Sequence, residues 1–260
     1  MERLALVLST LCFLGGFAAT VRNLTAEVPR RSSGNFLATT AGFALQTLWL
    51  SQRGQVVGRC PLTSLFDVLV FLAWSVSLLY LITGATYRLS LLGALTSPLV
   101  LALQVIALFL PTPPVAVPVN PVNGWLELHA AVSVVAYGAF ALAGLAGVML
   151  LVQERQLKTH RLSSVFFRLP PIRELAAANR RLVYTGFALL TVGLGAGIMQ
   201  GVAHVGFLKV VSVLVWSLYA FLCVALSLKR ITPRRASWLA IAAGVLLLLS
   251  VGAVQVVERS

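Results

Sequence analysis

The chain has 260 residues, of which 59% are hydrophobic and only 10% are charged, and its mean hydropathy is +0.94. A soluble domain carries about 25% charged residues, so this composition excludes an ordinary soluble protein. The formal net charge of +13 would suit nucleic acid. However, the basic residues lie in loops between apolar segments, which favours a lipid bilayer and no nucleic acid as the partner.

Apolar segments follow one another along the chain, and each is long enough for a transmembrane helix, which needs about 20 residues. They cover residues 4–21, 36–52, 63–84, 89–110, 125–153, 182–201, 207–228 and 236–257. The predicted fold is therefore an all-α polytopic bundle of about eight transmembrane helices forming one membrane domain. We divide it into an N-terminal four-helix region (1–110), an external proline-rich connector (111–124) and a C-terminal four-helix region (125–260).

Charges in the loops predict the orientation of this bundle. Fifteen of the 20 lysine and arginine residues fall in the loops after the first, third, fifth and seventh segments. Those loops should face the cytoplasm and both termini the outer side of a bacterial inner membrane. The first segment looks like a signal peptide, but its cleavage would move the basic loop 154–181 outside. We therefore expect it to remain as the first helix.

The loop 154–181 contains a short helical pattern. Pro170 and Pro171 precede the sequence IRELAAANRRL, and proline is favoured in the first turn of a helix. Leu175 and Leu182 oppose several arginines, so this helix would lie on the anionic inner leaflet, or the loop is simply a basic connector.

Glycines in the fifth and sixth segments predict close contact with neighbouring helices. They are Gly138, Gly144, Gly147, Gly193, Gly195, Gly197 and Gly201. We find no internal repeat strong enough to indicate an inverted-repeat transporter, and the scarcity of charge within the segments argues against ion coupling.

Two histidines are expected at the outer face. His129 lies about one turn inside the fifth segment, and His204 lies in the short loop after the sixth. Neutral imidazoles placed in this way would ligate a haem iron, or each would simply hydrogen-bond to a neighbour. Trp125 is expected at the same interface, where a tryptophan is common and would also suit a flat macrocycle.

Asp67 is the second candidate for a functional role. It lies about one turn inside the third segment, where a carboxylate is costly and needs a partner or a function. We name Arg59 as its expected partner, in an ion pair that is either structural or functional.

Several segments resemble the cytochrome c assembly family, which contains the CcsA and HemX membrane proteins. They are GRCPLTSLFDVLVFLAW (58–74), GWLELHAAVSVVAYGAFALAG (124–144), LVQERQLK (151–158), LPPIREL (169–175) and LVYTGFALLTVGLGAGIMQG (182–201). The resemblance implies an eight-span protein that holds haem at its outer face. It also implies that His129 is the first external haem ligand, that Asp67 is the acidic residue opening the third span, and that Trp74 closes the FLAW-like segment.

The chain also departs from the family pattern. The tryptophan-rich motif expected after the sixth span is replaced by GVAHVG. A later histidine is replaced, at about Val224, and Gln46 stands where another histidine would be expected. Either His204 substitutes as a ligand, or this member binds haem weakly or not at all.

The resemblance implies a non-enzymatic factor that binds or presents haem during cytochrome c biogenesis, with other assembly membrane proteins as partners. A HemX-like regulator or scaffold of haem biosynthesis, acting through its cytoplasmic loops, is the alternative. A small-molecule transporter is a third. The first predicts a haem spectrum that depends on His129, the second a partner that depends on loop 154–181, and the third predicts neither.

Overall fold

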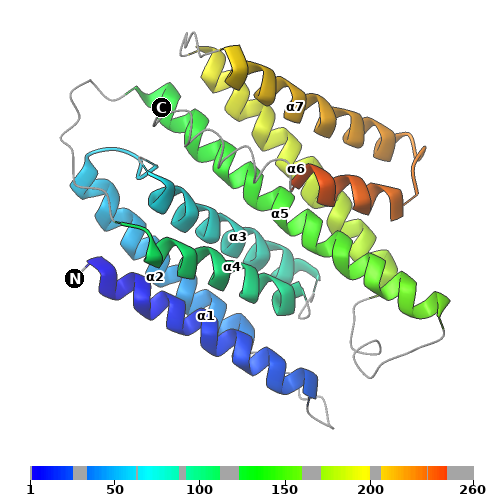
Figure 1. The fold of residues 1–260 in the computed structure, drawn as a ribbon, viewed down its shortest axis with the longest axis horizontal. Helices are drawn as coiled ribbons and strands as arrows, with labels where there is room; N and C mark the ends of the chain where they lie inside the picture. The colour runs from blue at the N-terminus through cyan, green and yellow to red at the C-terminus, as the bar shows by residue number, and fades with distance from the viewer. Residues whose placement is uncertain are drawn as a thin grey trace. The chain divides into compact units, whose positions relative to one another are not determined.

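The computed structural model describes residues 2–25, 34–62, 64–87, 92–111, 123–159, 171–199, 206–232 and 234–244. All regular structure within these residues is helical, which confirms the all-α prediction (Figure 1). A further helical stretch covers 234–244. The main helices are α1 (Glu2–Thr25), α2 (Gly34–Val57), α3 (Leu65–Tyr87), α4 (Leu92–Phe109), α5 (Gly124–Lys158), α6 (Ile172–Met199) and α7 (Gly206–Ser227).

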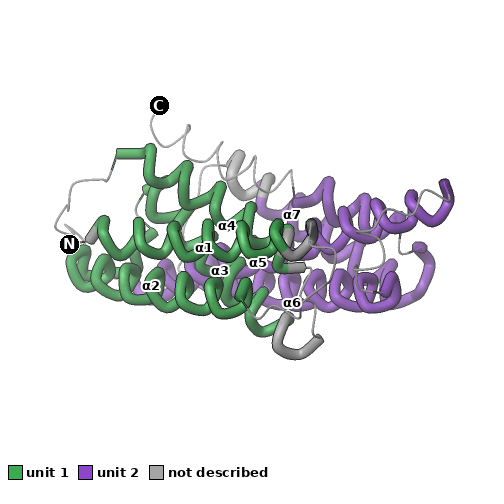
Figure 2. The backbone as a smooth tube through the Cα atoms, turned by 90° about the horizontal axis from the view of Figure 1, so that it is seen from below, with its two compact units in different colours: residues 1–122 green, residues 123–260 purple. Residues whose placement is uncertain are grey.

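The helices form two compact units, Met1–Val122 (unit 1) and Asn123–Ser260 (unit 2), coloured separately in Figure 2. By length and composition, α1, α3, α5 and α6 each contain a stretch able to cross a membrane. Large apolar side chains such as Phe109 and Ile198 are exposed. Exposed apolar faces are expected for helices surrounded by lipid, which is itself apolar.

Several helix boundaries differ from the sequence prediction, and those of α5 and α6 change its interpretation. The helix α5 continues to Lys158, so its 35 residues would extend about 50 Å, more than the hydrocarbon core of a bilayer. The short helix predicted before the sixth segment is not separate, because α6 runs unbroken from Ile172 to Met199. Leu175 and Leu182 are buried in the protein. The interpretation that they lie on the inner leaflet is therefore wrong.

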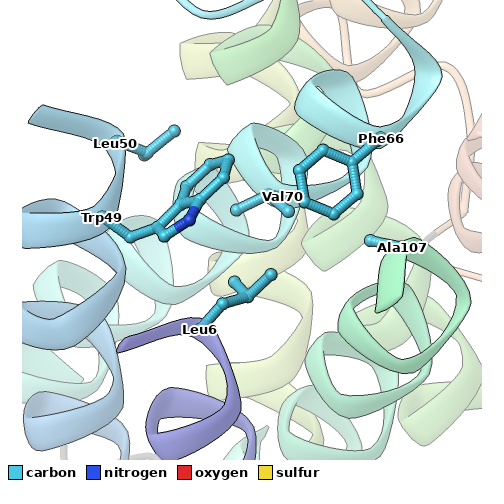
Figure 3. Close-up of a cluster of buried hydrophobic side chains, with 6 residues drawn as sticks. All are labelled: Leu6, Trp49, Leu50, Phe66, Val70 and Ala107. Atoms are coloured by element: carbon cyan, nitrogen blue, oxygen red, sulfur yellow. The ribbon is translucent and has the colours of Figure 1, made fainter. Parts of the chain in front are cut away.

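Unit 1 has an apolar core between its four helices, shown in Figure 3. Its buried members are Leu6, Trp49, Leu50, Phe66, Val70 and Ala107. The rings of Trp49 and Phe66 meet edge to face, with centroids 5.5 Å apart and an interplanar angle of 79°. This geometry is one of the two preferred by aromatic pairs, and it joins α2 to α3.

The two units share a repeated sequence that the sequence analysis missed. Residues 42–47 of α2 read GFALQT, and residues 186–191 of α6 read GFALLT. In both helices an asparagine stands seven residues before the glycine, at Asn35 and Asn179. The identical stretch is short, so the repeat is recognised mainly from the equivalent contacts that its residues make in the two units.

Equivalent residues make equivalent contacts within each unit. A Cβ at Gly42 would lie 2.8 Å from Phe13 Cζ, and a Cβ at Gly186 would lie 2.5 Å from Phe140 Cε1. Each phenylalanine comes from the preceding helix, α1 or α5. The glycine in each repeat thus lets an aromatic ring lie against the helix backbone.

A second pair of contacts repeats between the next two helices. The indole Nε1 of Trp74 donates to Thr47 Oγ1 at 2.8 Å, and that of Trp216 donates to Thr191 Oγ1 at 3.1 Å. Within each unit the ring also contacts a phenylalanine four residues before the threonine, with centroids 5.5 and 5.6 Å apart. Both units therefore use the same helix-to-helix contacts, which defines α1, α2 and α3 as the counterparts of α5, α6 and α7.

A buried ion pair joins α2 to the start of α3 in unit 1. The carboxylate of Asp67 is fully buried and lies 3.4 Å from the Nε of Arg53. Ser64, the residue before α3, accepts from the Asp67 backbone N–H and donates to the carboxylate at 3.0 Å. The expected partner Arg59 is exposed, so the prediction of that pairing is wrong. The cation that pairs with the acidic charge is instead Arg53, six residues before Arg59 in the chain.

We expect Arg53→Met to destabilise unit 1 by about 3–5 kcal/mol, because it leaves a buried carboxylate without its cation. The measurement is the unfolding free energy of the purified protein in detergent. The double variant Arg53→Met/Asp67→Asn removes both charges and keeps the hydrogen bond to Ser64, so it should recover most of the loss. Equal loss in the single and double variants would contradict this account.

Candidate functional site

His129 lies in the second turn of α5, which begins after Asn123. The side chain of Asn123 caps the helix by accepting a hydrogen bond from the Trp125 backbone N–H at 3.1 Å. The His129 ring is half-buried, and its Nδ1 lies 2.7 Å from the carbonyl oxygen of Gly193 on α6. A carbonyl only accepts, so Nδ1 carries the proton and donates it. The lone pair of the neutral ring is then on Nε2, the form in which a histidine binds a metal.

Two glycines of α6 make room for this histidine. A Cβ at Gly197 would lie 2.9 Å from His129 Nδ1, and a Cβ at Gly193 would lie 2.7 Å from Ser133 Oγ. His129 and Ser133 are four residues apart on α5, and the glycines are four apart on α6, so each pair lies on one helix face. Only a helix without side chains at 193 and 197 can approach α5 this closely.

The equivalent place in unit 1 is filled rather than open. When the alignment of the repeat is continued along both helices, Trp49 is equivalent to Gly193 and Arg53 is equivalent to Gly197. Trp49 occupies the apolar core and Arg53 pairs with Asp67. The seat for a half-buried imidazole is therefore a feature of unit 2 that the otherwise similar packing of unit 1 does not reproduce.

Trp125 lies one helical turn before His129, on the same face of α5. Its side chain is 48% exposed. The structure thus brings two of the predicted site residues together on one helix, with an indole surface available next to the imidazole.

The other predicted site residues stand apart from this pair. Asp67 belongs to unit 1, where Arg53 and Ser64 surround its carboxylate. His204 lies outside the described residues, as does His160. Among the residues that the structure describes, no group of three or more His, Cys, Asp or Glu side chains forms a metal site. Of the two predicted histidine ligands, the structure describes only His129.

Sequence reasoning predicted close packing by the glycines but not which contacts they make. Gly193 and Gly197 face α5, whereas a Cβ at Gly195 would meet nothing within 4 Å. The sequence does contain a signal for these contacts: two glycines four residues apart on α6 match a histidine and a serine four residues apart on α5. This match can be used only when the pairing and register of α5 and α6 are known.

The fold and this site define an α-helical, multi-pass membrane protein with a half-buried histidine near the start of α5. Residues 62–259 match the cytochrome C assembly protein family. The match covers well over half of the chain, and the chain therefore belongs to this family. The predicted resemblance is confirmed.

Individual relatives agree with this assignment. The chain is 29% identical over 160 residues to Protein HemX of Brevibacillus brevis, covering 61% of this chain and 59% of that protein. It is 30% identical over 161 residues to the cytochrome c biogenesis protein CcsA of Chlamydomonas reinhardtii, covering 59% and 44%. For CcsA of Synechococcus elongatus the identity is 33% over 124 residues, covering 45% and 38%. The matched part of the chain thus spans between about two fifths and three fifths of these relatives.

We expect Gly197→Ala to displace the His129 ring, because the added methyl carbon would lie 2.9 Å from Nδ1. The chain has three histidines, so ¹⁵N-histidine NMR of the detergent-solubilised protein can follow the protonated Nδ1 signal directly. The signal should shift and broaden in this variant.

The matched control is Gly195→Ala, two residues away on the same helix and facing open space. Its spectrum should be that of the wild type. A histidine signal unaffected by Gly197→Ala, or one equally changed by both variants, would contradict the contact.

Proposed function

We propose that this protein binds or presents haem at the outer face of a bacterial inner membrane during cytochrome c assembly, with His129 as the iron ligand. Membership of the cytochrome C assembly family supports the process. The observation that carries the site is the 2.7 Å hydrogen bond between His129 Nδ1 and the Gly193 carbonyl. This bond fixes the ring orientation and leaves Nε2 as the metal-binding atom.

The residues around His129 fit a flat, largely apolar cofactor with a metal centre. Haem would supply an iron atom that an imidazole nitrogen can ligate. His129 would be that ligand, and Trp125 would offer an aromatic surface one turn away. His204 is the candidate for the second ligand, since the sequence places it in the loop that follows α6. Asp67 would have a structural role, because its ion pair with Arg53 holds the start of α3 against α2.

The proposed topology follows from the apolar segments and the loop charges. Eight spans with both termini outside place the start of α5 at the outer face, and with it His129. The most basic loop, between α5 and α6, would then face the cytoplasm. Other membrane proteins of cytochrome c assembly would supply and receive the haem, and this chain would perform no covalent step itself.

A regulator or scaffold acting through cytoplasmic loops is the second candidate. It is favoured by the match to Protein HemX, which covers a larger share of the relative than the matches to CcsA do. The cytoplasmic ends of α5 and α6 would be its working surface, and it would not need His129.

The test is the absorption spectrum of the protein purified in detergent from haem-replete cells. We expect a Soret band in the wild type that His129→Ala abolishes or reduces several-fold. His204→Ala should do the same if it is the second ligand. His160→Ala, in the predicted cytoplasmic loop, is the control and should keep the band.

Two results would overturn the haem proposal. One is wild-type protein without haem, which would favour the regulator. The other is a Soret band that survives His129→Ala unchanged, which would show that the iron ligand lies elsewhere. Retention of the band in His204→Ala alone would remove only that residue from the site.

A further inference from the structure

Unit 2 contains a pocket of about 360 Å³, and all of its lining residues follow His129 in the sequence, from Arg173 onward. It is formed by the start of α6, the end of α7 and the segment that follows α7. Three basic residues line it: Arg173, Arg180 and Lys229. Among the described residues that line it there is no acidic side chain, and none of these three cations is paired with a carboxylate in the described part of the chain.

The spacing of the arginines explains the shape of the pocket. Arg173 and Arg180 are seven residues apart on α6, which places them two turns apart on one face. Ala176 and Ala177 lie between them and also line the pocket. Small side chains between two long cationic ones leave an open space with positive charge at both ends.

Lys229 occupies a position that normally needs glycine. The backbone N–H of Arg230 donates to the Ala225 carbonyl and that of Lys229 to the Leu226 carbonyl, the two bonds that close a helix end. In this motif the residue at position 229 takes a left-handed conformation, and its φ is 52°. A lysine is less favourable than a glycine in this conformation because its Cβ crowds the backbone. The strained residue is the one that lines the pocket, which suggests that its charge is used.

The lining of the pocket also includes uncharged polar and apolar side chains. Asn179 and Ser237 line it and are both buried, with Asn179 donating to the Ala143 carbonyl at 2.6 Å. In unit 1 the equivalent Asn35 and its neighbour Ser97 are hydrogen-bonded to each other at 2.9 Å. Apolar residues such as Leu226 complete the lining.

The pocket lies where charged and apolar parts of the helices meet. The first ten residues of α6 carry four charges, whereas the rest of the helix is apolar. The 28 residues of α6 extend about 42 Å, longer than the hydrocarbon core of about 30 Å, so the charged start belongs at the headgroup level. A ligand held here would need both an anionic group and tolerance of an apolar surface.

We propose that this pocket binds the phosphate group of an anionic phospholipid from the surrounding bilayer. Arginine and lysine are the side chains that bind phosphate, and basic pockets between membrane helices bind lipid headgroups in this way. Arg173 and Arg180 hold the phosphate from two turns of α6, and Lys229 closes the site from the end of α7. The acyl chains lie along the exposed apolar surface of α7. The proposal does not depend on haem binding.

The experiment is a titration of the full chain in a neutral detergent with short-chain phosphatidylglycerol, followed by thermal stabilisation. Lys229→Gly and Arg180→Gln should each weaken binding about tenfold, the loss expected for one charge-assisted hydrogen bond. Lys229→Gly should itself fold normally, because glycine relieves the left-handed strain. The thermal midpoint without lipid checks this.

Matched controls come from the same segment. Arg230→Gln and Arg235→Gln remove one exposed charge each without lining the pocket, and should leave affinity unchanged. Short-chain phosphatidylcholine should bind at least tenfold more weakly than phosphatidylglycerol. Equal losses in the pocket and control variants, or no difference between the two lipids, would overturn the proposal.

Competition by inorganic phosphate and glycerol phosphate tests whether the bound anion belongs to a lipid or to a soluble phosphate compound. The lipid proposal expects neither to compete at millimolar concentration. If either displaces phosphatidylglycerol and loses affinity in Lys229→Gly, the ligand is a soluble phosphate compound and the assignment to lipid is wrong.

Discussion

The close approach of α5 and α6 is the contact on which unit 2 depends. Gly186, Gly193 and Gly197 present bare backbone to α5, so Phe140, Ser133 and His129 lie directly against α6. In a bilayer there is no hydrophobic force between helices, and such contacts supply much of the association. The same contact orients the imidazole, because the Gly193 carbonyl is accessible only without side chains over it. Packing and site chemistry therefore come from the same residues.

The repeat shows how one framework can serve two purposes. Gly42 and Gly186 each seat a phenylalanine, so the two units start from the same helix contact. They then diverge at the helix ends: Trp49 and Arg53 fill unit 1, while glycines open unit 2. In unit 1 the arginine that takes the place of a glycine forms the buried ion pair with Asp67. Such a pair is costly to desolvate, so its value here lies in fixing α2 against α3 rather than in stability. Unit 1 is thus closed by side chains at the positions where unit 2 accommodates a half-buried histidine.

Composition and segment length were enough to predict the helices, because the bilayer leaves few alternatives to an apolar helix of fixed length. The sequence prediction was wrong for polar stretches at the helix ends, where the bilayer no longer restricts the structure. The start of α6 is polar enough to seem a separate surface helix, yet Leu175 and Leu182 are covered by protein. Arg59 is closer to Asp67 in the sequence than Arg53 is, and hydropathy alone does not reveal which of the two arginines is buried. His129 could be chosen from its position, but its Gly193 partner depends on helix register, which a single sequence does not reveal.

The helix α6 connects the basic pocket of unit 2 to His129. Arg180 lines this pocket and Gly197 faces His129, and the separation of 17 positions between them corresponds to about 25 Å along the axis. That distance is close to the thickness of the hydrocarbon core. A phosphate held by Arg180 at one interface would therefore place Gly197, and with it the imidazole, close to the opposite interface. A lipid bound at one end of the helix would therefore fix the depth of the histidine at the other end.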